Sequence, residues 1–284
     1  MARNEILVDE NVREFLSEDI GFGDITTDSI ISEDLQTEAT IFCNEDAVVA
    51  GLEEASKVFT ILGCTVKLLK EDGASVEAGT PVMQISGSGK AILKGERTAL
   101  NILMRMSGIS TATQKALAEA RKVSQRVRVA CTRKTAPGLS YFDKKAVELG
   151  GGDTHRFHLD DCVLIKDNHL KLVGSVKEAV KRAKKRTSFT KKVEVETENL
   201  NQAMEAAEAG ADIIMLDNMQ PGEILRVLKE LERKKLREKV LVEASGGITE
   251  ENIREYAKTG VDILSMGALT HSIRVIDMNL KVKG

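Results

Sequence analysis

The spacing of hydrophobic positions changes near the middle of the chain. Before about residue 107, helical and alternating patterns are mixed without a steady order. Apolar residues at helical spacing predict helices at 9–20 and 51–62, whereas short apolar stretches predict strands at 39–42, 47–49 and 65–69. Residues 72–93 add strands that are punctuated by glycine and one proline. The first part is therefore predicted to be a mixed α/β sandwich.

From residue 127 onward, apolar runs of strand length alternate with amphipathic helical segments. The predicted strands are 127–131, 162–166, 192–196, 213–216, 240–243 and 262–266, and the predicted helices between them include 176–185, 200–209, 221–231 and 250–258. Alternation of this kind predicts a parallel sheet, and six strands instead of eight predict an incomplete, TIM-like α/β barrel. The tail, 275–282, reads as one more strand, which is expected to return to the first domain.

Two helices are predicted on either side of Gly108, at 93–106 and from there to about residue 123. We interpret this glycine as a hinge or connector. The expected domains are therefore an N-terminal sandwich, 1–107, completed by 272–284, and a catalytic barrel, 108–271. The early segment GFGDITT, 21–27, is interpreted as a plain turn, because no strand precedes it as a nucleotide loop would require.

Composition limits the classes of partner. The formal net charge is −3, aromatic residues are 3% of the 284 residues and Trp is absent, which argues against a nucleic-acid partner. No apolar run approaches the roughly 18 residues that would span a bilayer, so no membrane partner is expected. The four cysteines are far apart, without metal-ligand spacing, and are expected to be reduced and mostly buried in a soluble, cytoplasmic protein.

Charged and small residues follow the predicted barrel strands in an ordered way. Functional side chains of an α/β barrel gather where strands end. In chain order, these positions hold Arg133 and Lys134, Lys166, Glu196, Asp217, the run Ser245, Gly246 and Gly247, and finally Gly267. Cations come first, carboxylates in the middle and glycines last, which is hard to obtain from surface residues alone.

Three local patterns refine this candidate site. Glu194 and Glu196 are two residues apart on a strand and should share one face, where Glu194 could instead form an internal salt bridge to a strand-end Lys or Arg. The loops ASGGIT, 244–249, and SMGALT, 265–270, are each expected to open a helical segment, and they favour phosphate binding because free backbone N–H groups and a helix N-terminus gather there. His155 is the stronger candidate for a functional residue, because Arg156 follows it and the segment GGGDT precedes it. His169 is either catalytic or a support for its loop.

The motifs together resemble the quinolinate phosphoribosyltransferase family. The matching segments, in order, are GDITT, ERTALNILMRMSGIST, TRKTAPG, GGGDTHR, LIKDNH, the VEVE strand, MLDN, EASGGIT and SMGALTHS. The family's fold is a mixed α/β sandwich, completed by the C-terminal tail, joined to an incomplete α/β barrel. One departure is Ser140, where the family commonly has arginine after TRKTAPGL, so no role is assigned to this position.

The resemblance implies transfer of phosphoribose from 5-phosphoribosyl 1-pyrophosphate to quinolinate with decarboxylation, giving nicotinate mononucleotide for NAD biosynthesis. It also implies a Mg²⁺ cofactor, and a homodimer, possibly within a hexamer, that shares its active sites. By family likeness the quinolinate carboxylates bind Arg133, His155, Arg156 and Lys166, and Arg97 enters the substrate site of a neighbouring subunit. Lys134 lies near pyrophosphate, and Glu196 and Asp217 face ribose and Mg²⁺. The 5-phosphate binds Ser245, Gly246, Gly247, Met266, Gly267 and Ala268.

Three other interpretations compete with this one. A paralogue of the same fold would act on another acceptor, although the segment LIKDNH argues against the molybdenum-transport-associated group. A phosphate-binding barrel lyase or isomerase would use Lys166 as a Schiff base, but it leaves the arginine-rich cluster unexplained. A binding module without catalysis would leave Glu196 and Asp217 without a task.

Overall fold

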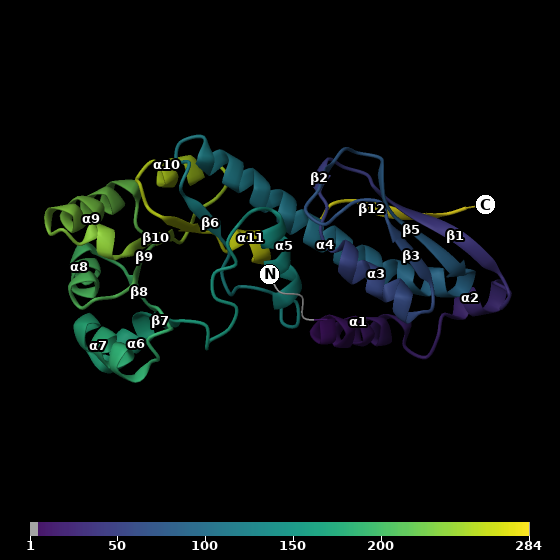
Figure 1. Ribbon diagram of the computed structural model, residues 1–284, viewed down its shortest axis with the longest axis horizontal. Coiled ribbons are helices and arrows are strands. Elements are labelled where there is room, and N and C mark those ends of the chain that lie inside the picture. The colour runs from purple at the N-terminus through teal and green to yellow at the C-terminus, as the bar shows by residue number, and fades with distance from the viewer. Residues whose placement is uncertain (1–4, 284) are drawn as a thin grey trace. The chain divides into compact units, whose positions relative to one another are not determined.

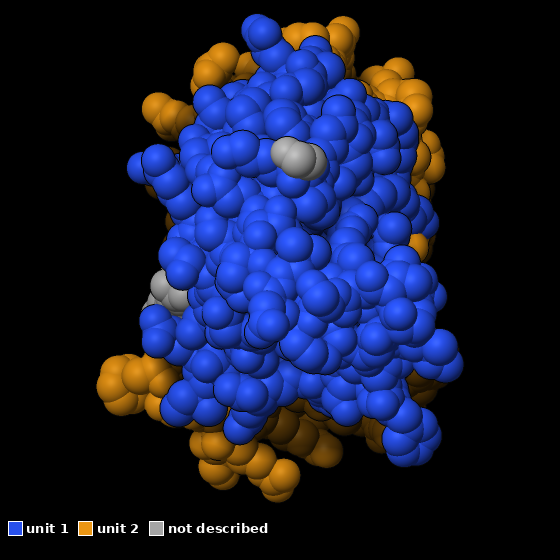
Figure 2. All heavy atoms as spheres, turned by 90° about the vertical axis from the view of Figure 1, so that its right-hand side faces the viewer, with its two compact units in different colours: residues 1–114, 136–151, 272–284 blue, residues 115–135, 152–271 orange. Residues whose placement is uncertain are grey.

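The structure, a computed structural model, describes residues 5–283, and the chain passes between two units (Figure 2). Unit 1 comprises 1–114, 136–151 and 272–284, and unit 2 comprises 115–135 and 152–271. The expected domains differ from these units at residues 108–114 and 136–151, and their residues 1–4 and 284 lie outside the described part of the chain.

Unit 1 contains an antiparallel sheet to which both ends of the chain contribute (Figure 1). Its elements are α1 (Glu5–Ile20), α2 (Ile25–Ile30), β1 (Gln36–Cys43), β2 (Ala47–Val48), α3 (Leu52–Ile61), β3 (Thr65–Leu68), β4 (Ser75–Val76), β5 (Thr80–Ser88), most of α4 (Gly89–Arg121), α5 (Ser140–Leu149) and β12 (Met278–Val282). The four-stranded sheet has the order β12-β1-β5-β3, and β2 pairs with β4 separately. Ile41 of β1 faces Leu280 of β12, so the predicted return of the tail strand is confirmed.

Apolar side chains of β1, β5 and α3 form the core of unit 1. Ile41, Met83 and Ile85 are fully buried, as is Phe59 of α3. Gly95 of α4 lies against Phe59, so close that an added Cβ would be 3.1 Å from its ring. Because alternate residues of a strand point to opposite faces, the sheet buries one face against the helices.

The predicted interruption at Gly108 is wrong, because α4 is one continuous helix of 33 residues. A Cβ at Gly108 would lie 2.3 Å from the backbone oxygen of Arg274. In the same region the N–H of Ile276 donates to the backbone oxygen of Met104 at 3.1 Å. Glycine therefore stands here to let the C-terminal segment pass close to the helix, and not to break it.

Helices α2 and α5 were not predicted. The interpretation of 21–27 as a plain turn is wrong for its second half, since Asp24 Oδ1 accepts a hydrogen bond from the Thr27 N–H at 3.0 Å and caps α2. Helix α5 buries charged residues next to apolar ones, which an apolar pattern does not reveal. Its Asp143 is fully buried and accepts two hydrogen bonds from Arg105 of α4, at 2.7 and 2.8 Å.

Unit 2 contains the six parallel strands and their helices. Its elements are β6 (Arg128–Ala130), β7 (Val163–Ile165), α6 (Asp167–Val173), α7 (Val176–Arg186), β8 (Val193–Thr197), α8 (Leu200–Glu208), β9 (Ile213–Asp217), α9 (Pro221–Arg233), η1 (Arg237–Lys239), β10 (Leu241–Ser245), α10 (Ile253–Ala257), β11 (Ile263–Ser265) and α11 (Ala268–His271). All the predicted strands are present, and α6 is an additional helix. In Figure 1, α7, α8 and α9 run along one side of β8, β9 and β10.

The sheet of unit 2 is an incomplete barrel, as predicted. Its order is β6-β11-β10-β9-β8-β7, so the last strand pairs with the first and no described pairing joins β6 to β7. On its free side, β6 binds a single residue, Asp153: the Asp153 N–H donates to Val129 O at 2.8 Å, and the Cys131 N–H donates to Asp153 O at 3.0 Å. The segment that follows Asp153 therefore starts beside the sheet.

Two further expectations concern the whole chain. The four cysteines are free, and three of them are buried. Among the described helices, none is long and apolar enough to cross a membrane.

Candidate active site

The register of the parallel strands shows which residues share the inner face of the sheet. Glu194 is paired with Ile213, and Glu196 with Met215, so the two glutamates lie on one face as predicted. The same face continues through Asp217 and Ser245, which are paired with each other, and through Glu243. Because all six strands are parallel, the polar residues that end them gather at one edge.

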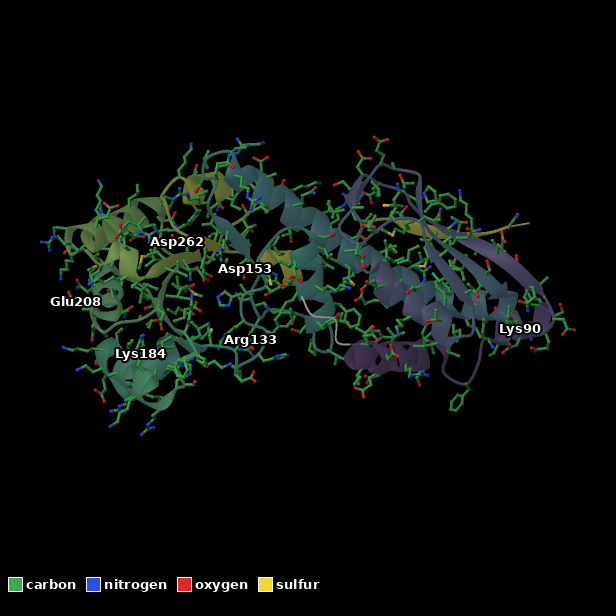
Figure 3. All side chains as sticks on the ribbon, in the orientation of Figure 1. Lys90, Arg133, Asp153, Lys184, Glu208 and Asp262 are labelled. Carbon is green, nitrogen blue, oxygen red and sulfur yellow. The ribbon has the colours of Figure 1, made fainter. Side chains whose placement is uncertain are left out.

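Acidic residues at the opposite, amino-terminal edge are structural. Asp262, labelled in Figure 3, precedes β11, accepts a hydrogen bond from the Val242 N–H at 2.7 Å and pairs with Arg237 at 2.9 Å. Asp212 likewise accepts from the Val193 N–H at 2.8 Å and pairs with Lys184 of α7 at 3.0 Å. Their carboxylates join neighbouring strands to the surrounding helices.

Lys166 and Glu196 form an ion pair at the carboxyl ends of β7 and β8. Lys166 Nζ lies 2.8 Å from Glu196 Oε2. Asp217 ends the next strand, β9, and burial, followed by the negative charge of Glu196, raises the pKa of Asp217 above its usual range. Asn218 Nδ2 donates to Asp217 Oδ2 at 2.6 Å. One ammonium group and two carboxylates therefore lie at three neighbouring strand ends.

The glycine loop after β10 is shaped by its contact with Asn218. Gly246 has φ +94° and Gly247 has φ +65°, conformations that favour glycine. A Cβ at Gly246 would be 2.2 Å from Asn218 Oδ1, and the Asn218 N–H donates to Ser245 O at 2.8 Å. This loop does not open a helix directly as expected, since α10 begins only at Ile253.

The glycine loop after β11 contacts the segment that carries Lys134. Helix α11 starts at Ala268, immediately after Gly267. A Cβ at Gly267 would lie 3.4 Å from Lys134 Cδ, and Thr270 Oγ1 donates to Lys134 O at 2.9 Å. The contact follows from the pairing of β6 with β11, which brings a basic loop and a glycine loop together.

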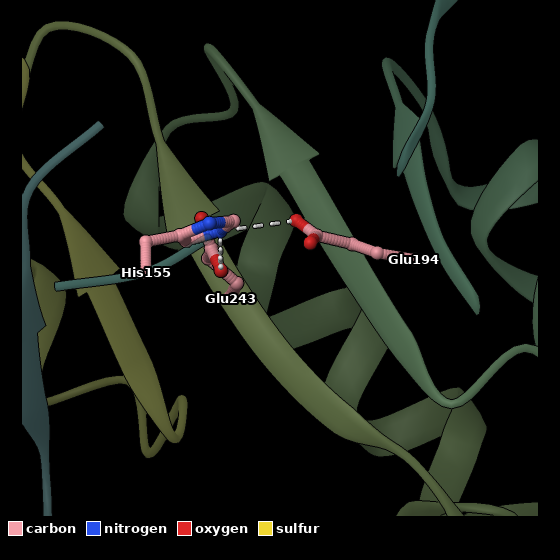
Figure 4. Close-up of side chains that lie close together, drawn as sticks. All are labelled: His155, Glu194 and Glu243. Carbon is pink, nitrogen blue, oxygen red and sulfur yellow. Dashed lines mark ion pairs between the residues drawn. The ribbon is translucent and has the colours of Figure 1, made fainter. Parts of the chain in front are cut away.

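A histidine and two glutamates meet inside the sheet, and we name His155, Glu194 and Glu243 the inner cluster (Figure 4). His155 Nε2 lies 3.5 Å from Glu194 Oε1 and 3.3 Å from Glu243 Oε2. Both glutamates are fully buried. Burial lowers the pKa of His155, but the two glutamates outweigh burial and raise it to about 10. Burial raises the pKa of Glu194 as well. The expected partner of Glu194, a strand-end Lys or Arg, is thus replaced by a histidine.

The remaining predicted residues have the following places. Arg133, labelled in Figure 3, is exposed in the loop after β6. Arg156 directly follows His155, and its Nη1 donates to Cys162 O at 3.4 Å. Arg97 is exposed on α4 in unit 1. His169 Nδ1 accepts from the Lys166 N–H at 2.9 Å at the start of α6, which favours the supporting role that the sequence left open.

Sequence reasoning missed Glu243 and Asn218. Glu243 lies in the strand LVEAS, where the alternation used for Glu194 would have placed it on the inner face as well. Asn218 has φ +56°, and asparagine tolerates this left-handed conformation better than most residues. Its position directly after the strand-end Asp217 is the signal that the sequence offered.

Charged groups and glycine loops share the carboxyl edge of a parallel sheet, the edge at which α/β-barrel enzymes carry their active sites. Models of the two domains of quinolinate phosphoribosyl transferase match residues 24–107, for the N-terminal domain, and 109–281, for the C-terminal domain. The chain belongs to the quinolinate phosphoribosyl transferase family.

Individual relatives match over nearly their whole length. A probable nicotinate-nucleotide pyrophosphorylase [carboxylating] from Methanothermobacter thermautotrophicus is 49% identical, covering 96% of this chain and 98% of the relative. The nicotinate-nucleotide pyrophosphorylase [carboxylating] of Homo sapiens is 38% identical, covering 87% and 82%. The solved structure of nicotinate-nucleotide pyrophosphorylase from Francisella tularensis is 37% identical with a TM-score of 0.92, covering 99% and 98%.

Proposed function

We propose that this protein transfers the phosphoribosyl group of 5-phosphoribosyl 1-pyrophosphate to the ring nitrogen of quinolinate, with loss of CO₂, to give nicotinate mononucleotide and pyrophosphate. The observation that carries this proposal is the Lys166–Glu196 ion pair beside Asp217, at the carboxyl edge of a sheet whose chain matches both domains of the family. The carboxylating name of its relatives supports the same reaction.

The dicarboxylate would bind a group of cations. Its members are Arg133, His155, Arg156, Lys166 and, from a second subunit, Arg97. Arginine suits this task because its planar fork binds a carboxylate through two parallel hydrogen bonds. Lys166 is held by Glu196, and is therefore oriented before substrate arrives.

Glu196 and Asp217 would stabilise the reacting ribose. Departure of pyrophosphate develops positive charge at the anomeric carbon, and carboxylates nearby offset it. Lys134 would neutralise the leaving pyrophosphate. The loops at Ser245 to Gly247 and Met266 to Ala268 would bind the 5-phosphate through backbone N–H groups, and Lys134 contacts the second of them.

The same two carboxylates fit a Mg²⁺ ion. Burial and then the negative charge of Glu196 raise the pKa of Asp217, which indicates that the two carboxylates lie near each other. Mg²⁺ prefers oxygen ligands and binds through one or two carboxylates plus substrate phosphate. When bound there it would neutralise charge on the pyrophosphate, while Glu196 and Asp217 orient the ribose.

Decarboxylation needs little from the protein. Once the ring nitrogen carries the ribose it is cationic, and this charge stabilises the carbanion that loss of CO₂ leaves at the adjacent carbon. No dedicated base is required, so the side chains contribute mainly orientation and charge.

The Lys166 Schiff-base alternative is disfavoured by the ion pair. A Schiff base requires a free amine nitrogen, whereas the Nζ of Lys166 is bound to Glu196 Oε2 at 2.8 Å. Only an assay with quinolinate can distinguish this protein from a member of the same fold that uses another acceptor.

The assay incubates the purified protein with Mg²⁺, quinolinate and 5-phosphoribosyl 1-pyrophosphate. We expect nicotinate mononucleotide, pyrophosphate and CO₂ in equal amounts, and loss of activity with a chelator. Glu196→Ala should reduce turnover by two orders of magnitude or more, on the order of what loss of a transition-state charge costs. Glu208→Ala, on the surface of α8 (Figure 3), is the matched control and should leave it unchanged. Turnover of nicotinate but not of quinolinate would refute the proposed acceptor.

A homodimer in which Arg97 completes the neighbouring site is a second part of the proposal, and the enzyme is expected in the cytoplasm. Arg97→Ala and Lys166→Ala should each be inactive but folded. When the two are unfolded together and refolded as a mixture, about half of the dimers are hybrids, and each hybrid has one intact site, so about a quarter of wild-type activity should return. Each variant refolded alone is the control. A mixture that stays inactive would refute the shared site.

A further inference from the structure

The inner cluster places two carboxylates where they have few partners. Glu194 and Glu243 are both 0% exposed. Apart from the contact with His155, neither accepts a hydrogen bond within the described part of the chain, and His155 Nε2 lies 3.5 Å from Glu194 and 3.3 Å from Glu243. Removing a carboxylate from water costs several kcal/mol. The burial of two carboxylates therefore requires compensation from His155, and it indicates that they have a function.

The two ring nitrogens of His155 face different groups. His155 Nδ1 accepts a hydrogen bond from the Arg156 N–H at 2.8 Å, and Nε2 faces the two glutamates. The charge of Arg156 also acts on Glu194.

The same hydrogen bond argues against a metal ion in the cluster. One histidine and two carboxylates are suitable ligands. Coordination through Nε2, however, would leave the proton on Nδ1, where it would face the Arg156 N–H. The geometry instead requires Nε2–H to donate between the two carboxyl groups.

The backbone around His155 depends on this anchor. His155 has φ +50°, a conformation that costs a residue with a side chain about 1 kcal/mol. Its N–H donates to Asp153 Oδ1 at 2.8 Å, while the backbone of Asp153 is bound to β6. One side of the turn is thus fixed by the sheet, and the other side, which leads into Arg156, is fixed by the imidazole.

We propose that Glu194 and Glu243 are positioning residues: they hold the His155 imidazole inside the sheet and thereby fix the turn that presents Arg156 to the dicarboxylate. This rests on the proposed function, because it assigns Arg156 to quinolinate. Neither glutamate needs to touch the substrate. Their effect travels through the imidazole to the Arg156 N–H.

The test compares the effect of each substitution on KM for quinolinate with its effect on KM for 5-phosphoribosyl 1-pyrophosphate. Glu243→Leu removes an acceptor of the Nε2–H and should raise KM for quinolinate about tenfold or more, as expected when a binding group is misplaced. KM for 5-phosphoribosyl 1-pyrophosphate and kcat should change less than about threefold. Glu243→Gln keeps an acceptor oxygen and should restore KM. Glu54→Leu removes a carboxylate of similar burial in unit 1 and should leave the quinolinate KM unchanged.

Two results would overturn the proposal: an unchanged quinolinate KM in Glu243→Leu, or an equal rise in both KM values. If Glu243→Leu does not fold, Glu243→Asp, which withdraws the carboxylate by one methylene, should show the same selective rise. Failure of the wild type to use quinolinate would refute the proposed function instead.

An activity-independent measurement decides the state of the cluster. ¹⁵N NMR of the histidine side chains in the wild type should show no titration of His155 between about pH 6 and 8. Titration of His155 in this range, or a stoichiometric divalent metal in the purified protein, would refute this anchor.

Discussion

The close contact between Gly246 and Asn218 gives the sharpest stability prediction. Replacing Gly246 by alanine adds a Cβ that would lie 2.2 Å from Asn218 Oδ1 and 2.9 Å from Asn218 N. The adjacent Gly247 offers a matched control, since a Cβ there meets no atom within 4 Å. Both glycines have positive φ, so the two substitutions share backbone strain and differ in the clash.

The expected magnitudes follow from these two terms. Backbone strain of an alanine in a left-handed conformation costs about 1–2 kcal/mol, which is the whole effect expected for Gly247→Ala. At Gly246, the overpacking of a closed site adds about 1–3 kcal/mol. Asn218 cannot simply withdraw, because its N–H is bound to Ser245 O and its amide to Asp217. Gly246→Ala should therefore lose about 2–5 kcal/mol.

Urea unfolding of both variants and the wild type measures these free energies. The slopes of the unfolding curves should be equal, so that the midpoints report stability alone. If Gly246→Ala is no less stable than Gly247→Ala, the contact with Asn218 does not constrain this loop, and the reasoning is refuted.

Two other predictions concern α4 and the inner cluster. Gly108→Ala should lower the free energy of unfolding by about 1–3 kcal/mol because its Cβ meets the backbone of Arg274. The control Gly222→Ala, in the open first turn of α9, should leave the free energy of unfolding unchanged or raise it by up to about 1 kcal/mol. Equal urea midpoints for the two variants would contradict this prediction. Because the two glutamates raise the pKa of His155 to about 10 in the folded protein, stability should fall as pH rises from 6.5 towards about 10, by at most about 1.4 kcal/mol per pH unit. Glu194→Gln/Glu243→Gln should flatten that slope in unfolding measured at several pH values, and a wild-type slope as shallow as the variant's would count against the raised pKa of His155.

Much of the fold was readable from local patterns. Each parallel strand of unit 2 was predicted to within about two residues, because a buried strand is a short apolar run bounded by polar residues. The order of cations, carboxylates and glycines at the strand ends was likewise visible, since parallel strands bring their carboxyl ends to one edge. The return of β12 to β1 was predicted, and the register confirms it.

Local patterns failed where a distant segment decided the structure. Gly108 read as a helix breaker, but it fills a place against Arg274, which lies far along the chain. Helix α5 was missed because its buried face includes Asp143, whose charge is compensated by Arg105 of another helix. A buried acid looks like a surface residue until its partner is known.

Part of the candidate site could likewise be predicted from local patterns, and part could not. The sequence alone determined the types of chemical group, their assignment to strand ends and the inner face shared by Glu194 and Glu196, because these depend on alternation along single strands. Only the tertiary structure joined His155, Glu194 and Glu243, which come from a loop and two non-adjacent strands. Their meeting depends on strand order and on the binding of Asp153 beside β6, contacts between residues far apart in sequence that no local periodicity encodes.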